Sequence, residues 1–210
     1  MVLRFASGKD IGGIVTIHRA AFPSFFMTQL GPLFLAEYYR VVLAYRQRIF
    51  LVSGSGSDIN GFVAGFIDAP RFYASLRRDV IRVGLALVPA VLRHPSRLRR
   101  VLFNFRKNAG GAEGHAPPDA AELASVAVSP LCSGRGIGAR LVDGFIAQAS
   151  SQGARFVYLT TDAENNDAVN RLYLRMGFAL HRMFVTPPER KMNEYRFALT
   201  GQGSKCAENS

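Results

Sequence analysis

The stretch at residues 123–141, LASVAVSPLCSGRGIGARL, constrains the fold more than any other part of the chain. Its first residues are apolar or small, which is typical of a largely buried strand. Pro130 has no N–H to donate to a ladder and therefore ends that strand. Three glycines follow, and apolar residues then recur every four positions at Ile137, Leu141 and Phe145, as on one face of a helix. The stretch predicts a strand, a glycine-rich turn and a helix in succession.

The chemistry of the glycine-rich turn points to an anion. Gly134, Gly136 and Gly138 allow the backbone to curl so that its N–H groups face one point. The helix that follows contributes unpaired amides and the positive end of its dipole. A P-loop would require Gly-x-x-x-x-Gly-Lys-Ser/Thr, and a dinucleotide fingerprint would require Gly-x-Gly-x-x-Gly. The turn has Gly-x-Gly-x-Gly with no Lys-Ser or Lys-Thr pair after it, so it matches neither pattern.

Residues 133–138 resemble instead the acetyl-CoA loop of the GCN5-related N-acetyltransferases (GNAT superfamily), whose motif reads Arg/Gln-x-x-Gly-x-Gly/Ala. The sequence departs from it at Ser133, where the family usually has Arg or Gln, and Arg135 or Arg140 could supply the missing charge. Residues 166–178, NDAVNRLYLRMGF, resemble the family's Asn-x-x-x-x-x-Leu-Tyr-x-x-x-Gly-Phe signature. Both motifs occur in the family's order, separated by one predicted helix and one predicted strand.

The resemblance implies acetyl-CoA as co-substrate and no metal. The strand before the glycine-rich turn is called the cofactor strand. The backbone of its residues 126–128 would pair with the pantetheine amides as an added strand does, and one of its N–H groups could face the thioester oxygen. Asn166 would contact the cofactor, although an ordinary helix N-cap is the alternative. The residues expected to bind the cofactor are Val126, Ala127, Val128, Ser133, Gly134, Arg135, Gly136, Ile137, Gly138, Ala139 and Asn166.

Two residues are expected to carry the chemistry. By resemblance, Tyr173 matches the family tyrosine that approaches the CoA sulfur and can protonate the departing thiolate. The alternative is a core aromatic residue beside Leu172. Glu122 begins the cofactor strand, where related enzymes often place a carboxylate that faces the acceptor. It is either the base that deprotonates the amine or an exposed strand-end carboxylate, in which case an ordered water is the base.

The resemblance also implies one α/β domain of the GNAT fold over residues 1–200. Residues 201–210 are expected to form a disordered tail. In this fold a mixed, mostly antiparallel central sheet is flanked by helices. Here a helical insertion precedes the cofactor strand. Apolar patterning predicts the other strands and the helices. Strands are expected at residues 2–5, 49–52, 61–67, 156–159, 178–185 and 195–199. Helices are expected at residues 11–22, 33–44, 137–152 and 166–176.

Two local features refine these expectations. Gly65 lies inside a predicted strand, where a glycine indicates a β-bulge or a close backbone neighbour. In the helix at residues 33–44, we expect Leu33, Phe34 and Tyr38 on the inner side, together with Val41 or Val42.

The insertion at residues 70–118 is the main departure from the family pattern. Ten basic residues lie between Arg71 and Lys107, and Asp79 is the single acid in that stretch. Apolar residues at helical spacing predict two or three basic amphipathic helices beside the acceptor side of the cleft. The interpretations are a solvated helical hairpin, an acceptor-binding lid or, less favoured, a membrane-surface element.

Charge, cysteine and histidine spacing, and hydropathy indicate which ligands and which cellular location to expect. The formal net charge is +11 and the pI is about 10.4, and part of this excess suits the phosphates of coenzyme A. The two cysteines have no metal-ligand spacing, which indicates a reducing cytoplasm. The four histidines also lack ligand spacing, and no metal is expected. No apolar run reaches the ~18 residues that a membrane span requires. The expected location is the cytoplasm.

The leading interpretation is an acetyl-CoA-dependent N-acetyltransferase that transfers directly to a primary amine in a ternary complex. The acceptor would be a small molecule or a peptide, and the protein a monomer or homodimer. No nucleic-acid partner is expected, because no helix-turn-helix, zinc-finger or RNA-binding signature is present. Two alternatives stay open. One is a nucleic-acid- or membrane-surface-binding protein that uses the basic insertion. The other is a sensor that binds CoA without catalysis.

Overall fold

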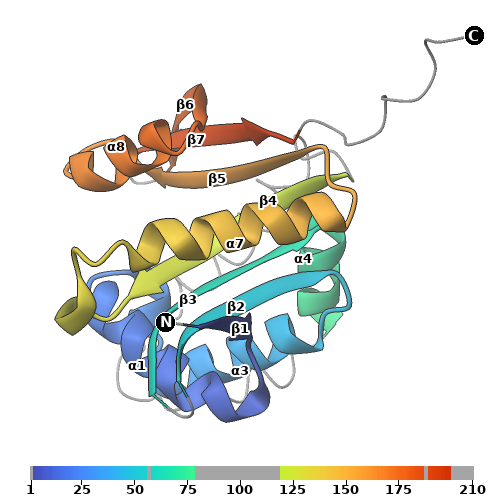
Figure 1. The fold of residues 1–210 in the computed structure, drawn as a ribbon, viewed down its shortest axis with the longest axis vertical. Coiled ribbons are helices and arrows are strands. Elements are labelled where there is room, and N and C mark those ends of the chain that lie inside the picture. Colours follow the sequence, from blue (N-terminus) through green and yellow to red (C-terminus); the bar gives the residue numbers. More distant parts are fainter. Residues whose placement is uncertain (1, 56–57, 79–118, 187–188, 200–210) are drawn as a thin grey trace, which may run out of the picture.

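The computed structural model describes residues 2–55, 58–78, 119–186 and 189–199. Within these ranges the strands form one sheet in the order β1-β2-β3-β4-β5-β7-β6 (Figure 1). All neighbours pair antiparallel except β4 and β5, which are parallel. The strands are β1 (Leu3–Phe5), β2 (Arg48–Ser55), β3 (Asp58–Ile67), β4 (Ala120–Val128), β5 (Phe156–Asp162), β6 (Ala179–Thr186) and β7 (Arg190–Ala198).

Helices cover both faces of this sheet. In Figure 1, α7 crosses one face, whereas α1 and α3 lie on the other. A short helix, α4, follows β3 directly, and α8 precedes β6. The helices are α1 (Ile11–Ala21), α2 (Phe26–Gln29), α3 (Pro32–Ala44), α4 (Ala69–Arg78), α7 (Ile137–Ser151) and α8 (Asp167–Arg175), with 3-10 turns η1 (Gly8–Asp10) and η2 (Pro130–Cys132).

The predicted elements are confirmed, with differences at their ends and faces. The closing hairpin is longer than expected, because β7 begins at Arg190 and not at Tyr195. On the inner side of α3, Phe34 and Val42 are buried as predicted, and Leu35 and Tyr39 are buried as well. Leu33, which is also predicted to face inward, is 59% exposed. Only the start of the predicted insertion is described, as α4. Residues 79–118, and the tail at 201–210, lie outside the described residues.

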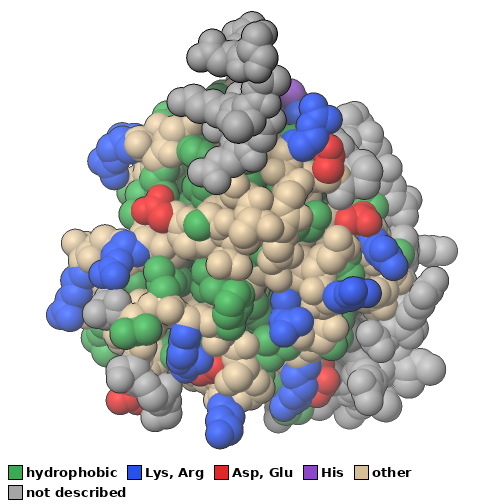
Figure 2. Space-filling view, turned by 45° about the vertical axis from the view of Figure 1, so that its right-hand side comes forward, with side chains coloured by type: hydrophobic (Ala, Val, Ile, Leu, Met, Phe, Trp, Pro, Cys, Tyr) green, Lys and Arg blue, Asp and Glu red, His purple; other side chains and the backbone are tan. Residues whose placement is uncertain are grey.

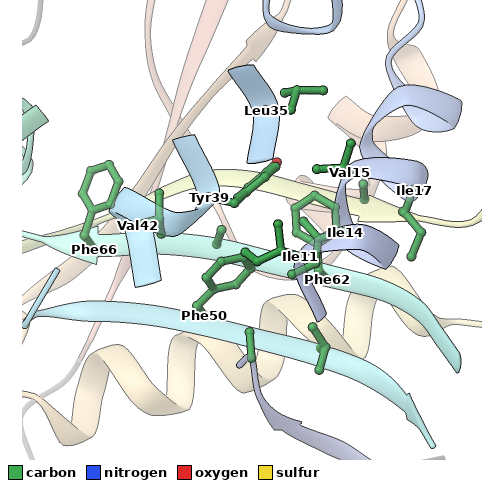
Figure 3. Packing of buried hydrophobic residues seen from close by; sticks show 14 of the residues in the cluster. Ile11, Ile14, Val15, Ile17, Leu35, Tyr39, Val42, Phe50, Phe62 and Phe66 are labelled. Carbon is green, nitrogen blue, oxygen red and sulfur yellow. The ribbon is translucent and has the colours of Figure 1, made fainter. Parts of the chain in front are cut away.

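Two apolar clusters hold the helices to the sheet. The first lies under α1 and α3, where Tyr39 packs between Phe50 and Phe62 at ring-centroid distances of 5.6 and 5.3 Å (Figure 3). The second lies under α7, whose Leu141 and Phe145 are fully buried. Burial of such side chains stabilises the fold by roughly 1.5–3 kcal/mol each. A separate apolar cluster therefore holds the helices on each face of the sheet.

A β-bulge interrupts the pairing of β3 with β4. Leu123 pairs with Gly65, but the next pair is Ser125 with Ala64, so Ala124 is the additional residue. A Cβ on Gly65 would lie 2.0 Å from the backbone oxygen of Glu122 and 2.7 Å from the Phe145 ring. Both features predicted for Gly65, a bulge and a close backbone neighbour, are confirmed.

The bulge determines which side chains of β4 share a face. In a regular strand, residues three apart point to opposite faces. Here Glu122 and Ser125 face the same side, because Glu122 bonds to Tyr73 of α4 and Ser125 to Tyr39 of α3. Leu123 and Val126 both pack in the cluster under α7. The extra residue therefore brings two polar groups to the α3 side.

The parallel pairing of β4 with β5 is short. Only three registers are formed, the last between Glu122 and Tyr158. Both strands continue beyond this point, β4 to Val128 and β5 to Asp162. The sheet therefore splits after Glu122, and residues 123–128 of β4 are not paired with β5.

We expect Gly65→Ala to destabilise the protein, because the added methyl group would overlap the Glu122 carbonyl oxygen. Overpacking of this kind costs about 1–3 kcal/mol in unfolding free energy. Gly12→Ala in α1 is the matched control, because its Cβ would have nothing within 4 Å. It should leave stability unchanged or higher by about 0.5–1 kcal/mol. Urea unfolding checks both, and equal stability of the two variants would contradict the role given to Gly65.

Candidate active site

The glycine-rich turn has the shape of an anion cradle. Gly134 and Gly136 adopt φ values of +76° and +71°, which side chains other than glycine rarely adopt. Nothing lies within 4 Å of the position where either glycine would carry a Cβ. Gly136 is the N-cap of α7, so the first amides of that helix open onto this space. Ser133 and Arg135 are exposed beside the turn.

Apart from Asn166, the residues predicted to bind the cofactor fall into two groups. Around the turn, the Ile137 side chain is 2% exposed and packs in the core, so only its backbone could face a ligand. Gly138 and Ala139 are half-buried in the first turn of α7. Along β4, Val126, Ala127 and Val128 lie beyond the last β4–β5 pair. A strand edge and a helix N-terminus thus both border the split and suit the amides and the pyrophosphate of coenzyme A.

Glu122 accepts two hydrogen bonds from phenols at the point where the sheet splits. Its Oε1 accepts from the Tyr73 hydroxyl at 2.9 Å, and its Oε2 accepts from the Tyr158 hydroxyl at 2.8 Å. Tyr158 is its direct neighbour in the parallel ladder. Glu122 is therefore not the exposed strand-end carboxylate of the alternative interpretation, but a partly buried and oriented one.

The position of Tyr73 is set by its neighbours in α4. Phe72 is fully buried and stacks on Phe66 of β3 with ring centroids 3.8 Å apart. Tyr45 packs against Phe72 and donates to the backbone oxygens of Ile67 and Asp68 at 3.2 and 3.3 Å. These contacts anchor α4 to the end of β3. They direct the next residue, Tyr73, to the carboxylate.

The surroundings of Glu122 raise the pKa of its carboxyl group. Burial is the main cause, because it penalises the charged form, and the nearby Glu194 adds repulsion. The hydrogen bonds from Tyr158 and Tyr73 lower the pKa but only partly offset these effects. The pKa of Tyr73 is itself raised well above its usual value by burial and by the charge on Glu122. A carboxylate with a raised pKa is a stronger base than one in water.

Tyr173 lies on the other face of the sheet. It is 4% exposed and packs against Phe178 and Tyr195 at centroid distances of 5.5 and 6.0 Å. Tyr195 pairs with Leu159, one residue beyond the last β4–β5 pair. Burial raises the pKa of Tyr173, so its phenol stays protonated at neutral pH. Tyr173 and Glu122 thus approach the split from opposite faces.

Asn166 holds the start of α8 against the end of β5. Its Nδ2 donates to Thr161 Oγ1 at 2.7 Å and to the Asp162 backbone oxygen at 3.3 Å. Asn170 donates to the same Asp162 oxygen at 3.0 Å and to the backbone oxygen of Asn166 at 3.0 Å. These bonds give Asn166 a structural role at the helix N-terminus, and its contact with a cofactor stays a prediction.

Sequence reasoning misses several residues of this site. It places Tyr158 in a continuous apolar strand and Tyr73 in the insertion, with no role for either. Tyr38 is a third phenol close enough to interact with the charge on Glu122. The parallel register of β4 with β5 would have found Tyr158, because it places that residue directly beside Glu122. No sequence signal identifies Tyr73, since its position depends on the packing of α4.

A model of the acetyltransferase (GNAT) family matches residues 15–178. This chain belongs to that family. The match covers both motifs from which the resemblance was inferred and confirms it, and the mixed α/β sheet is the fold that the resemblance implied. The GNAT family uses acetyl-CoA, which agrees with the predicted co-substrate.

Many solved structures share this fold. The structure of yncA from Salmonella typhimurium with its cofactor acetyl-CoA is 18% identical, with a TM-score of 0.62 over 99% of this chain and 98% of that chain. Ribosomal-protein-alanine N-acetyltransferase from Brucella melitensis is 15% identical, with a TM-score of 0.63 over 95% and 100%. An aminoglycoside 6'-acetyltransferase type Ii is 12% identical, with a TM-score of 0.61 over 94% and 97%. Comparison with curated proteins returned no match. The similarity shows the fold and leaves the acceptor open.

Two negative findings bear on the partners of this GNAT chain. Within the described ranges, no three His, Cys, Asp or Glu side chains are grouped so that they could hold a metal ion. In the same part of the chain, no helix is both long and apolar enough to cross a membrane.

We expect Gly138→Asp to weaken acetyl-CoA binding, because its carboxylate would stand beside the turn that is predicted to bind the pyrophosphate. A Cβ at this position meets only Val128 at 3.7 Å, an ordinary contact, and the backbone requires no positive φ. Gly138→Ala is therefore the matched control for added volume without charge. Calorimetry should show at least a tenfold rise in Kd for the aspartate, about 1.4 kcal/mol, and little change for the alanine. Unchanged affinity of a folded aspartate variant would contradict the assignment.

Proposed function

We propose that this protein is an acetyl-CoA-dependent N-acetyltransferase that moves the acetyl group directly to a primary amine in a ternary complex. The observation that carries the proposal is the split between β4 and β5, which Glu122 and Tyr173 approach from opposite faces. An amine that arrives beside Glu122 and a thioester that extends from the glycine-rich turn would meet there. Such positioning supplies much of the rate enhancement in two-substrate reactions.

The residues around the split have complementary roles in this reaction. Glu122 takes a proton from the ammonium group, directly or through a water, and frees the nitrogen lone pair. The nitrogen forms a bond to the acetyl carbon, and the carbon–sulfur bond breaks with its electron pair on sulfur. The nitrogen then releases its second proton to solvent, which gives the neutral amide. Tyr173 donates its proton to that thiolate and regains one from solvent. A backbone N–H of β4 beyond Glu122 would donate a hydrogen bond to the acetyl oxygen as negative charge develops on it.

The chain's own geometry fits the donor. The unpaired edge of β4 can bond to the pantetheine amides, and the open turn at Gly134 and Gly136 can hold the pyrophosphate. The exposed Arg135 and Arg140 add positive charge near that turn. These features support acetyl-CoA as a substrate over the alternative of a protein that does not bind CoA.

The alternative of a nucleic-acid-binding surface finds less support. On the face shown in Figure 2, Lys and Arg side chains are spread around the molecule, and acidic ones lie among them. Nucleic-acid-binding proteins usually gather such charges in one patch or stripe. We therefore propose a small-molecule or peptide amine as the acceptor. We also propose the cytoplasm as the location of the protein. The basic residues at 79–118 lie outside the described residues.

We expect Tyr173→Phe to lower kcat on the order of 10²-fold, a typical effect of removing a general acid. Acetyl-CoA affinity should stay nearly unchanged, because the ring keeps its contacts with Phe178 and Tyr195. Measurement of kcat by thiol release and of Kd by calorimetry separates the two quantities. A kcat equal to that of the wild type would leave Tyr173 with a packing role alone.

We expect Glu122→Gln to weaken the rise of kcat/KM with pH, because the rise reports deprotonation of the base. Stability gives an independent readout. The folded-state pKa of Glu122 is raised, so the native state binds more protons, and wild-type stability falls as pH rises from the ordinary carboxyl pKa to the raised one. The substitution removes this fall, and the variant should be at least as stable as the wild type at neutral pH. If kcat/KM of the variant depends on pH as in the wild type, an ordered water is favoured as the base.

A further inference from the structure

An arginine stands in register with the proposed base, two strands away. Glu122 of β4 pairs with Tyr158 of β5, and Tyr158 pairs with Arg196 of β7. Residues directly opposite one another project from the same face of a sheet. Adjacent strands are about 4.8 Å apart, so the backbones of Glu122 and Arg196 are separated by roughly 10 Å. Burial and the charge on Glu122 raise the pKa of Tyr158, and the charge on Arg196 partly offsets this rise, which agrees with its proximity.

The arginine belongs to a cluster with a net positive charge. Glu194 is 4% exposed and accepts hydrogen bonds from Arg182 Nε at 2.7 Å and from Arg196 Nε at 2.9 Å. Two guanidinium groups thus share one carboxylate. Within the described residues, no other carboxylate forms an ion pair with either arginine. The cluster therefore retains about one unit of positive charge on the face that carries Glu122.

The cluster is held rigidly and is open to solvent. The Arg196 guanidinium lies 5.0 Å from the centre of the Phe156 ring, and the Arg182 guanidinium lies 5.2 Å from that of Phe184. Their side chains remain 29% and 38% exposed. Fixed, partly desolvated guanidinium groups bind carboxylate and phosphate oxygens well.

We propose that the acceptor is a dipolar molecule whose amine meets Glu122 and whose anionic group, a carboxylate or a phosphate, meets Arg196 and Arg182. This inference rests on the proposed function and names its substrate class. A monoamine would leave the excess positive charge of the cluster without an anionic partner. A diamine would bring a second ammonium group against it, and repulsion would disfavour binding.

Acceptors matched in length test the proposal. We would measure kcat/KM for 3-aminopropionate against propylamine, for 4-aminobutyrate against butylamine and 1,4-diaminobutane, and for phosphoethanolamine against ethanolamine. Each comparison is made at equal concentration of free base. We expect at least one anionic acceptor to exceed its neutral partner tenfold, and the diamine to be the poorest. Comparison of phosphoethanolamine with the two aminocarboxylates shows whether a phosphate or a carboxylate is preferred.

Two variants assign the preference to the cluster. Arg196→Gln should reduce the ratio of anionic to neutral acceptor towards one, whereas Glu194 keeps its ion pair with Arg182 and the fold is retained. Arg155→Gln is the control, because Arg155 carries the same charge just before β5 but is 79% exposed and pairs with Asp119. It should leave the ratio unchanged. If Arg196→Gln does not fold, Arg182→Gln should show the same loss of preference.

The outcomes separate this inference from the proposed function. Equal turnover of anionic and neutral acceptors, or a preference that survives in the folded Arg196 and Arg182 variants, would overturn the dipolar acceptor and leave amine acetylation standing. Absence of acetyl transfer to every amine, in a protein that binds acetyl-CoA, would overturn both.

Discussion

The close approach of Gly65 to the carbonyl oxygen of Glu122 is the constraint on which the rest of the site depends. Only a residue without a side chain permits the bulge at this point of the β3–β4 ladder. The bulge turns Glu122 and Ser125 to the same face, and this face carries α3 and α4. Without it, β4 would continue with regular alternation, and these polar groups would point to opposite sides of the sheet. One backbone contact therefore organises the side of the sheet on which we propose that the acceptor binds.

The environment of Glu122 contrasts with the charge of the whole protein. The chain carries a formal charge of +11, yet the groups that touch this carboxylate are neutral phenols. An arginine in the same place would hold the carboxylate ionised and lower its pKa. The phenols orient the oxygens of Glu122, and the pKa of its carboxyl group stays raised by burial. Positive charges lie further along the sheet, on Arg196 and Arg182, where Glu194 holds them.

Sequence reasoning found the parts of the site that have a local signature. Glycine spacing and the strand–turn–helix pattern located the turn, and the motif around Tyr173 located α8, because both depend on residues close together in the chain. The tyrosines around Glu122 come from α4, β5 and α3 and meet only through the register of the sheet and the stacking of Phe72 on Phe66. Periodicity predicts the burial of Phe34 and Val42 in α3, but it wrongly includes Leu33 and misses Leu35 and Tyr39, because spacing alone does not fix where the buried face of a helix is centred. Long-range pairing, and not composition, supplies what was missing.

The short ladder between β4 and β5 would give acetyl-CoA a structural role in the proposed complex. Three registers join the strands β1 to β4 to the strands β5, β7 and β6, so the sheet is nearly two sheets that share one seam. In the proposed complex, the pantetheine arm lies along the unpaired edge and adds rungs where the protein has none. The substrate would then form part of the sheet as well as take part in the reaction. Each turnover would remove these rungs and form them again.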